Sequence, residues 1–406
     1  MTTVKNTTPE LAIPQKSERN MGVELFRIVS MMLVVSLHVL GHGGVLTYSK
    51  PLSDNYKVAW FLETIGYCSV NCYAIISGFA NVKTKFKFRR FVHLWLETVV
   101  LTLAMTSIAH FFIPSMQVDS EWWTIAVLPL TKKALWYLCA YFFMYPLIPI
   151  LNKGLLSLTK RQHLAIIFWL QVPTIIRLIE HKDNYVMGSG YSAIWLICLY
   201  VIGAYFRIYG APKWAKWFVT IPVFFIAAYI AWYKKIYFEI QLDQKLIEKT
   251  AVEYENRQDL INYLSPCMVI MATMLLLFFM QVKIRFKPTK VIILNLAKAT
   301  WGVFVLHVCC AGWYWNDVWH IFRKFPSYST FKMVGCVFLA VMAIYFAASL
   351  FTIGKIYLFK LLRVEKGINF IADIPGKIIA RREEKQREIQ RRKEEFKKHH
   401  RKKRKR

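Results

Sequence analysis

The chain has few acidic residues and lacks the short motifs of common soluble enzymes. Only 24 Asp and Glu stand against 54 Lys and Arg, which gives a formal net charge of +30. There is no phosphate-binding glycine loop, no HExxH zinc motif and no pattern typical of a Ser-His-Asp triad. The 8 cysteines have no zinc-ligand spacing with histidines, so we interpret them as small packing residues. The sequence therefore supports neither covalent serine chemistry nor a bound metal.

The chain also lacks internal repeats, a cleavable signal and any polar stretch large enough for a separate soluble enzyme domain. A missing period of roughly 20 to 50 residues disfavours repeat architectures. We expect the first apolar segment to act as its own insertion signal. Any chemistry must then take place within the apolar part of the chain.

Apolar residues are what the chain has in abundance. They make up 56% of the sequence, aromatic residues make up 16%, and the mean hydropathy is +0.33, which is too apolar for a soluble domain. We predict an all-α, polytopic bundle of about ten transmembrane helices. The expected spans are 24–42, 58–80, 91–113, 134–152, 163–180, 190–208, 216–233, 261–282, 291–312 and 333–360.

The charges in the loops predict how this bundle is oriented. Loop 83–90 holds five basic residues, loop 283–290 holds four, and loops 153–161 and 207–216 hold three each, all without an acid. Basic loops face the cytoplasm in multi-pass proteins. The loops that alternate with these basic ones also contain acidic residues, which lower their net positive charge. They are 41–57, 113–133, 180–190, 234–260 and 313–332. We therefore predict a multi-pass cell-membrane protein with both termini in the cytoplasm.

The chain divides into three regions. Residues 1–20 are polar and predict a short disordered lead, residues 21–360 form the transmembrane domain, and residues 361–406 form a basic cytoplasmic tail that can be helical. Within 377–406 there are 16 basic and 5 acidic residues, a net charge of +11. Such a tail favours solvent or anionic lipid headgroups, with nucleic acid as the less favoured partner.

The first span carries ionisable side chains. About 100° per residue brings His38 to within about 20° of Arg27, so both share one helix face roughly 16 Å apart. Glu24 precedes Arg27 by three residues and His42 follows His38 by four. The ordinary interpretation is a Glu24–Arg27 ion pair and a hydrogen-bonded core histidine. Ionisable groups at membrane depth, however, often mark a functional site.

Other spans offer weaker candidates. Glu63 lies near the outer end of the second span and would line an acceptor path. Ser77 and Gly78 favour close helix packing, with contact to the substrate as the alternative. At the entry to the third span, Arg90, His93 and Glu97 share a face. That face predicts either a positive border with a His93–Glu97 pair or a phosphate-binding site.

Two later features have an ordinary interpretation and a functional one. A lone His307 in the ninth span is more typical of a satisfied core residue than of a catalyst. The glycines before Tyr191, at 188 and 190, predict a plain turn or, as the alternative, a thin loop beside a cavity.

The order of several short motifs resembles acyltransferase family 3, whose members acylate carbohydrate hydroxyls at cell surfaces. The resemblance covers about residues 20–360. The first-span pattern is Arg27, ten intervening residues and His38. The other matching segments are 76–79, the basic entry 87–90, 135–138, 199–205 and 297–307. Glu24 stands where the family usually has aspartate, and His93 stands where it often has a second arginine.

The resemblance implies a donor, an acceptor and a set of site residues. The donor would be acetyl-CoA or another short acyl-CoA, with no permanently bound cofactor. The acceptor would be a sugar hydroxyl of a surface polysaccharide or a lipid-linked precursor, and the location a bacterial plasma membrane. The implied catalytic residues are His38, as general base or transient acyl carrier, and Arg27, which would anchor a CoA phosphate or stabilise charge on the thioester oxygen. The implied binding residues are Lys87, Arg89 and Arg90 for the donor and Glu24, His42 and Glu63 for the acceptor.

Two other functions fit part of the pattern. A multi-span transporter of a lipid-linked sugar or small solute would also bury charge, but the repeats and paired broken helices common in transporters are not evident. A membrane scaffold that recruits a partner through its basic tail would lose its function when 377–406 is deleted. The enzyme interpretation predicts only partial loss.

Overall fold

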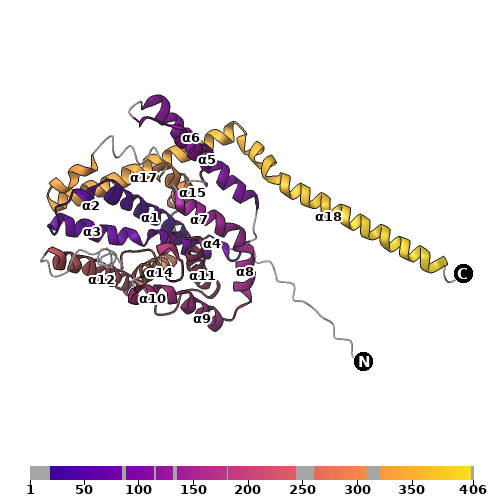
Figure 1. Ribbon diagram of the computed structural model, residues 1–406, viewed down its shortest axis with the longest axis horizontal. Coiled ribbons are helices and arrows are strands. Elements are labelled where there is room, and N and C mark those ends of the chain that lie inside the picture. Colours follow the sequence, from indigo (N-terminus) through magenta and orange to yellow (C-terminus); the bar gives the residue numbers. More distant parts are fainter. Residues whose placement is uncertain are drawn as a thin grey trace.

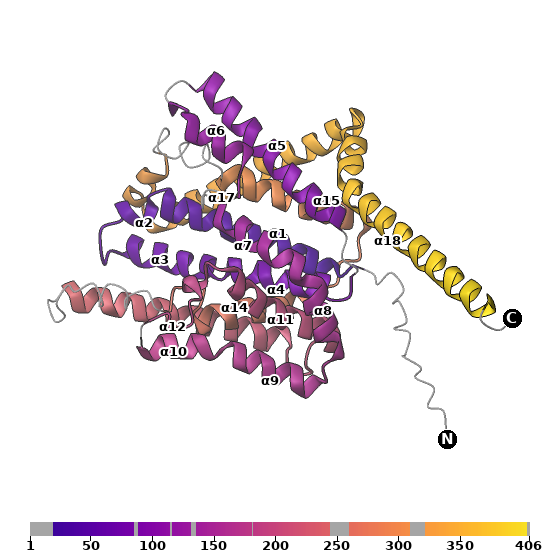
Figure 2. The same cartoon turned by 45° about the vertical axis from the view of Figure 1, so that its right-hand side comes forward.

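A computed structural model describes residues 19–84, 88–113, 116–130, 135–180, 182–243, 260–308 and 321–403. Within this part of the chain every regular element is a helix, as expected from the sequence (Figures 1 and 2). The elements are α1 (Met21–Leu37), the π-helical turn η1 (His38–His42), α2 (Val45–Tyr48), α3 (Asp54–Tyr67), α4 (Ser69–Asn81), α5 (Phe88–Phe112), α6 (Ser120–Val127), α7 (Trp136–Met144), η4 (Tyr145–Leu147), α8 (Ile148–Ser157), α9 (Lys160–Leu170), α10 (Val172–Glu180), η5 (Gly188–Gly190), α11 (Ala193–Tyr209), α12 (Trp217–Asp243), α14 (Pro266–Gln281), α15 (Lys287–Val308), η6 (Phe322–Ser327), α17 (Thr330–Leu361) and α18 (Val364–Lys403).

Side-chain caps fix where several helices begin. The Asn20 side chain accepts hydrogen bonds from the backbone of Gly22 and Val23 at the start of α1. Thr159 and Gln162 form a reciprocal capping box at the start of α9. Because the first backbone N–H groups of a helix have no partner within it, such caps satisfy donors that would otherwise be lost.

Seven helical stretches within the described residues are long and apolar enough to cross a membrane. They are Met21–His42, Phe88–Phe112, Trp136–Ser157, Lys160–Glu180, Trp217–Asp243, Lys287–Val308 and Thr330–Leu361. The other three predicted spans, 58–80, 190–208 and 261–282, also fall on helices. Helices α11 and α14 are shorter than a full span, and a turn at Cys68 divides the span predicted at 58–80 into α3 and α4. The count of ten crossings therefore stays a prediction.

Helix α1 lies in the centre of the bundle. It contacts α3 and α4, and on its other sides α14, α15 and α17. In both views α15 and α17 lie on one side of it, and α11, α12 and α14 on the other (Figures 1 and 2). Two glycines permit this packing, because a Cβ on Gly22 would lie 1.9 Å from the Phe279 carbonyl oxygen and one on Gly66 2.9 Å from a Leu37 methyl carbon. The predicted site-bearing helix is thus also the structural core.

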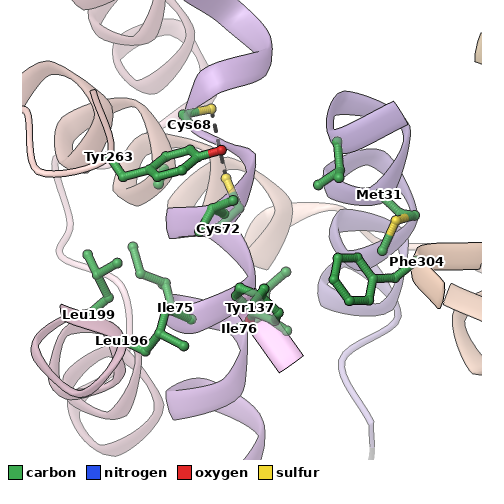
Figure 3. Close-up of a cluster of buried hydrophobic side chains, with 14 of the residues drawn as sticks. Met31, Cys68, Cys72, Ile75, Ile76, Tyr137, Leu196, Leu199, Tyr263 and Phe304 are labelled. Carbon is green, nitrogen blue, oxygen red and sulfur yellow. Dashed lines mark hydrogen bonds between the residues drawn. The ribbon is translucent and has the colours of Figure 1, made fainter. Parts of the chain in front are cut away.

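Helices α4 and α11 pack backbone to backbone. A Cβ on Gly78 would lie 2.0 Å from the Tyr200 carbonyl oxygen, and one on Gly203 would lie 1.8 Å from that of Ile75. Leu196 and Leu199 of α11 lie beside Ile75 of α4 (Figure 3). The interpretation of Gly78 as a packing residue is confirmed.

The four basic loops lie at one end of the bundle. Asn152 donates to the carbonyl of Asn81 at 2.9 Å, and Tyr209 donates to that of Leu158 at 2.8 Å. Asn20, before α1, donates to the carbonyl of Met280 at 3.3 Å, just before the fourth basic loop. This clustering is what the charge pattern predicted. Its assignment to the cytoplasmic side remains a prediction from the distribution of charge.

Three loop and tail regions complete the fold. The predicted outer loop 113–133 contains α6, which packs along α5 and accepts a hydrogen bond from Thr102 at the Ala126 carbonyl. Helix α12 continues from the span predicted at 216–233 into the predicted loop 234–260 and ends at Asp243, and 244–259 lies outside the described residues. In the tail, α18 extends away from the bundle as one long helix (Figure 1).

Candidate active site

A cavity of about 1020 Å³ runs alongside α1. Its walls come from α1, α3, α4, α5, α6, α7 and α15, together with the loops before α11 and α14. One end, here called the Arg27 end, contains Arg27, Asn81 and Arg90 and lies toward the basic loops. The other, the His42 end, contains His42, Glu63 and Tyr67. The two polar residues predicted to share a face of the first span therefore line one continuous space.

A π-helical turn presents the two histidines of the first span. Helix α1 changes at His38 into η1, in which the Gly43 N–H donates to the His38 carbonyl at 2.7 Å, five residues back. The rings of His38 and His42 lie at a centroid separation of 5.2 Å in this turn, and both residues line the cavity. Single π-turns inside α-helices occur frequently at functional sites.

His307 lies against His38. Their ring centroids are 4.9 Å apart, although the two residues come from opposite ends of the chain. His307 Nδ1 lies 2.6 Å from the carbonyl oxygen of Val303 and so donates its proton there. In the neutral ring this leaves Nε2 as the acceptor, and no hydrogen-bond partner is found for it among the described residues. The interpretation of His307 as a satisfied core residue is confirmed for Nδ1 and stays a prediction for Nε2.

At the opposite end, Arg27 is held from two sides. Glu24 forms an ion pair with its guanidinium at 3.1 Å, and the Tyr73 hydroxyl donates to its backbone carbonyl at 2.8 Å. Arg27 lines the cavity, and Glu24 is not among the lining residues. The predicted ion pair is confirmed, and the carboxylate of Glu24 orients Arg27 instead of facing the space where a ligand would lie.

The two adjacent arginines of α5 point to different neighbours. Arg90 lines the cavity, whereas Arg89 Nε donates to the Asn369 side-chain oxygen of α18 at 2.6 Å. His93 bonds to the same oxygen, and Glu97 pairs with Lys355 of α17. The alternative of a His93–Glu97 pair is wrong, because both side chains face the neighbouring helices. The predicted donor residue Lys87 lies outside the described residues.

Glu63 is buried in the wall of the His42 end, with 7% of its surface exposed. A Cβ on Gly41 would lie 3.9 Å from its Oε1, so the carboxyl group lies beside the π-turn that carries the two histidines. Within the described residues Oε2 has no hydrogen-bond partner. A buried acceptor without a donor is costly, which is typical of groups that meet a ligand.

Much of the remaining lining is aromatic, and sequence reasoning assigned none of it to the site. Part of it belongs to segments that carry the family resemblance, since Trp136 follows the start of 135–138 and Trp301 lies in 297–307. Tyr191 could have been found from its adjacent glycines, because Gly190 has φ +91° and a Cβ there would lie 2.5 Å from that of Tyr263. The full aromatic lining is Tyr67, Tyr73, Trp122, Trp136, Tyr137, Tyr141, Tyr145, Tyr191, Tyr263, Trp301 and Phe304.

Polar contacts at the Arg27 end are few and specific. Ser77 and Tyr141 approach each other at 3.5 Å, and the Tyr141 hydroxyl lies within electrostatic reach of both Arg27 and Arg90. Over the described residues no group of three His, Cys, Asp or Glu has the placement needed to hold a metal ion. In the described part of the cavity wall, the groups suited to bind anions or to move protons are the guanidinium groups of Arg27 and Arg90, the imidazoles of His38 and His42, and the carboxyl group of Glu63.

Comparison with known families gives one match. The sequence model of acyltransferase family 3, described as an acyltransferase domain, matches residues 20–353. No curated protein matches the chain. No solved structure matches it either.

Proposed function

Because the chain belongs to acyltransferase family 3, we propose that this membrane acyltransferase moves an acetyl or other short acyl group from acyl-CoA to a sugar hydroxyl. The observation that carries the proposal is the single cavity that joins two guanidinium groups at one end to His38, His42 and Glu63 at the other. An acyl transfer between two large substrates needs two binding regions that meet at one base.

The Arg27 end is suited to the donor. Arginine binds phosphate groups through paired N–H donors, and Arg27 and Arg90 are the two guanidinium groups of the cavity wall. With the phosphates bound there, the pantetheine arm would extend along α1 for roughly 16 Å to place the thioester at His38. Arg89, bonded to Asn369, would add charge at the Arg27 end without touching the donor. The family resemblance adds Lys87 as a further donor residue. The distribution of charge among the loops favours a cytosolic position for the Arg27 end.

His38 then acts as the general base. A sugar hydroxyl is a weak nucleophile at neutral pH, and an imidazole is suited to remove its proton. The hydroxyl oxygen bonds to the acyl carbon while the C–S bond breaks. The proton passes to His38 and from there to the departing thiolate, which leaves as CoA-SH. His42 and Glu63 lie where they would orient the hydroxyl.

A covalent route uses the same residue. An imidazole nitrogen of His38 bonds to the acyl carbon, the C–S bond breaks, and the other ring nitrogen gives its proton to the thiolate. The sugar oxygen next takes the acyl group, and its proton returns to the ring. The two routes differ in one observable, because only the second leaves labelled protein when acyl-CoA is supplied without a sugar.

The test is acetyl transfer by purified protein in lipid nanodiscs supplied with radiolabelled acetyl-CoA and membrane-derived glycan. We expect His38→Ala to lower transfer by roughly 10²- to 10⁴-fold, the usual contribution of a general base. The matched control is His110→Ala, since His110 is exposed on α5 and does not line the cavity. Transfer by His38→Ala at the rate of the control would remove His38 from the mechanism.

A further inference from the structure

Four aromatic residues gather at the His42 end of the cavity. Trp136 of α7 lies 4.5 Å from Tyr191 and 5.7 Å from Tyr263, measured between ring centroids, and Tyr263 lies 4.8 Å from Tyr67 of α3. All four residues line the cavity. Their surfaces remain partly open, because Tyr191 is 45% exposed and Trp136 and Tyr67 are half-buried. Four separate segments of the chain thus contribute to one aromatic wall.

This aromatic wall is fixed by buried polar contacts behind it. Asn71 donates to the Tyr263 backbone carbonyl at 2.8 Å and accepts from the Trp195 indole N–H at 3.3 Å. Gly190 has no side chain, which lets the loop before α11 lie directly on Tyr263. Rings held in this way lose little freedom on binding, so they can contribute affinity at low entropic cost.

Glu63 adds a polar group to this wall. Its Oε2 has no partner among the described residues, and the hydroxyl groups of Tyr67 and Tyr263 lie within its electrostatic reach. No Lys or Arg is found among the described lining residues at this end, whereas Arg27 and Arg90 lie at the other. An anionic ligand would find no fixed cation here. A neutral ligand with hydroxyl donors and an apolar face would satisfy both the carboxyl group and the rings.

We propose that the aromatic wall and Glu63 form the binding site for a neutral hexopyranose unit of the acceptor. This assignment rests on the proposed acyltransferase function. The C–H face of the sugar ring packs on Trp136 and Tyr191, and one hydroxyl donates to Glu63. A neighbouring hydroxyl then faces His38, because Glu63 lies beside the π-turn that carries this histidine. Trp136, Tyr191 and Glu63 are specificity-determining residues in this arrangement.

The test separates acceptor binding from donor chemistry. Purified protein in nanodiscs receives radiolabelled acetyl-CoA and either methyl β-glucopyranoside or glucose 6-phosphate as the probe acceptor. We expect label on the neutral glycoside in preference to the phosphate. Trp136→Ala and Tyr191→Ala should each raise the KM for the glycoside by about tenfold, equal to about 1.4 kcal/mol, with the KM for acetyl-CoA unchanged. Trp136→Phe should recover most of the loss, because it restores a ring.

Trp123→Ala is the matched control, since Trp123 packs on His110 and does not line the cavity. A preference for glucose 6-phosphate, or equal effects of Trp136→Ala on both KM values, would overturn the sugar site. The sugar site would also be overturned if a non-sugar acceptor were labelled with a KM that Trp136→Ala and Tyr191→Ala leave unchanged. The proposed acyl transfer would stand in that case. If wild-type protein consumes no acetyl-CoA with any acceptor, the proposed acyltransferase function itself is contradicted, and the sugar site with it.

Discussion

At the residue scale, the chemistry depends on two histidines of the cavity wall, His38 and His42, and on a third, His307, whose ring packs against that of His38. The sequence predicted that Arg27 and His38 share a face, because helical periodicity alone places two residues that are eleven positions apart on the same side of a helix. It could not predict that His307 meets His38, since that contact depends on how α15 packs against α1. Tyr263 could not be predicted either, since it lies in a loop and carries no periodic signal, whereas the glycines before Tyr191 already indicated a thin loop beside a cavity as one alternative.

His307 should act as a positioning residue. Its Nδ1 donates to the Val303 carbonyl, which fixes the His307 ring, and this ring packs against that of His38 and limits the orientations open to it. We expect His307→Ala to lower kcat by roughly tenfold or more while the KM for acetyl-CoA stays the same. Steady-state kinetics over a series of acetyl-CoA concentrations measure both values. A change in the donor KM with unaltered kcat would show that His307 serves the donor instead.

Arg90 should matter for donor binding. Replacing it with Gln removes one of the two guanidinium groups of the cavity, so the KM for acetyl-CoA should rise about tenfold and kcat should change little. Arg161→Gln is the control, because Arg161 is exposed on α9 and does not line the cavity. The acetyl ester of dephospho-CoA supplies a second check. The KM values of Arg90→Gln and Arg161→Gln for this donor should differ less, because one phosphate group is missing. Equal donor KM values for both variants would sink the assignment of Arg90.

The close contact of α4 with α11 governs stability at the element scale. Each helix carries a glycine where the backbone of the other passes, and both glycines fall in segments that carry the family resemblance. The sequence indicated Gly78 as a packing residue, since small residues let membrane helices approach. It could not identify α11 as the partner, because the polarity of a fully buried helix is nearly uniform around its axis.

Gly203→Ala should destabilise the protein. Its Cβ would lie 1.8 Å from the Ile75 carbonyl oxygen, so the helices must separate, and we expect a loss of roughly 1 to 3 kcal/mol, as for other overpacked sites. The thermal midpoint in detergent reports this loss. Gly354→Ala is the matched control, because nothing lies within 4 Å of the position and alanine favours the helix. A midpoint for Gly203→Ala at or above that of the control would refute the close contact.

At the scale of the whole molecule, composition and loop charge predicted a helical membrane bundle whose basic loops share one end. The structure bears out the helical class and that clustering, and the family match bears out the resemblance. The number of crossings was harder to predict, because α3 and α4 together equal one predicted span but are divided at Cys68. The cavity could not be predicted either, since it arises from the packing of seven helices.

The basic tail should modulate activity without being required for it. Residues 377–406 carry a net charge of +11, and α18 meets the bundle through Asn369, which lies before them. Deletion of 377–406 should lower acetyl transfer in nanodiscs with anionic lipid and leave it unchanged in neutral nanodiscs, because basic residues bind anionic headgroups. Complete loss in both lipids would contradict this modulating role and show that the tail is required for acetyl transfer.

The most direct test of the central claim places donor and acceptor on opposite sides of the membrane. Proteoliposomes would contain methyl β-glucopyranoside in the compartment that faces the His42 end, with radiolabelled acetyl-CoA added on the side of the basic loops. One cavity that joins Arg27 and Arg90 to His38 and Glu63 predicts labelled sugar with wild-type protein and essentially none with His38→Ala. Equal labelling by His38→Ala, or labelling only when both substrates share a compartment, would contradict it.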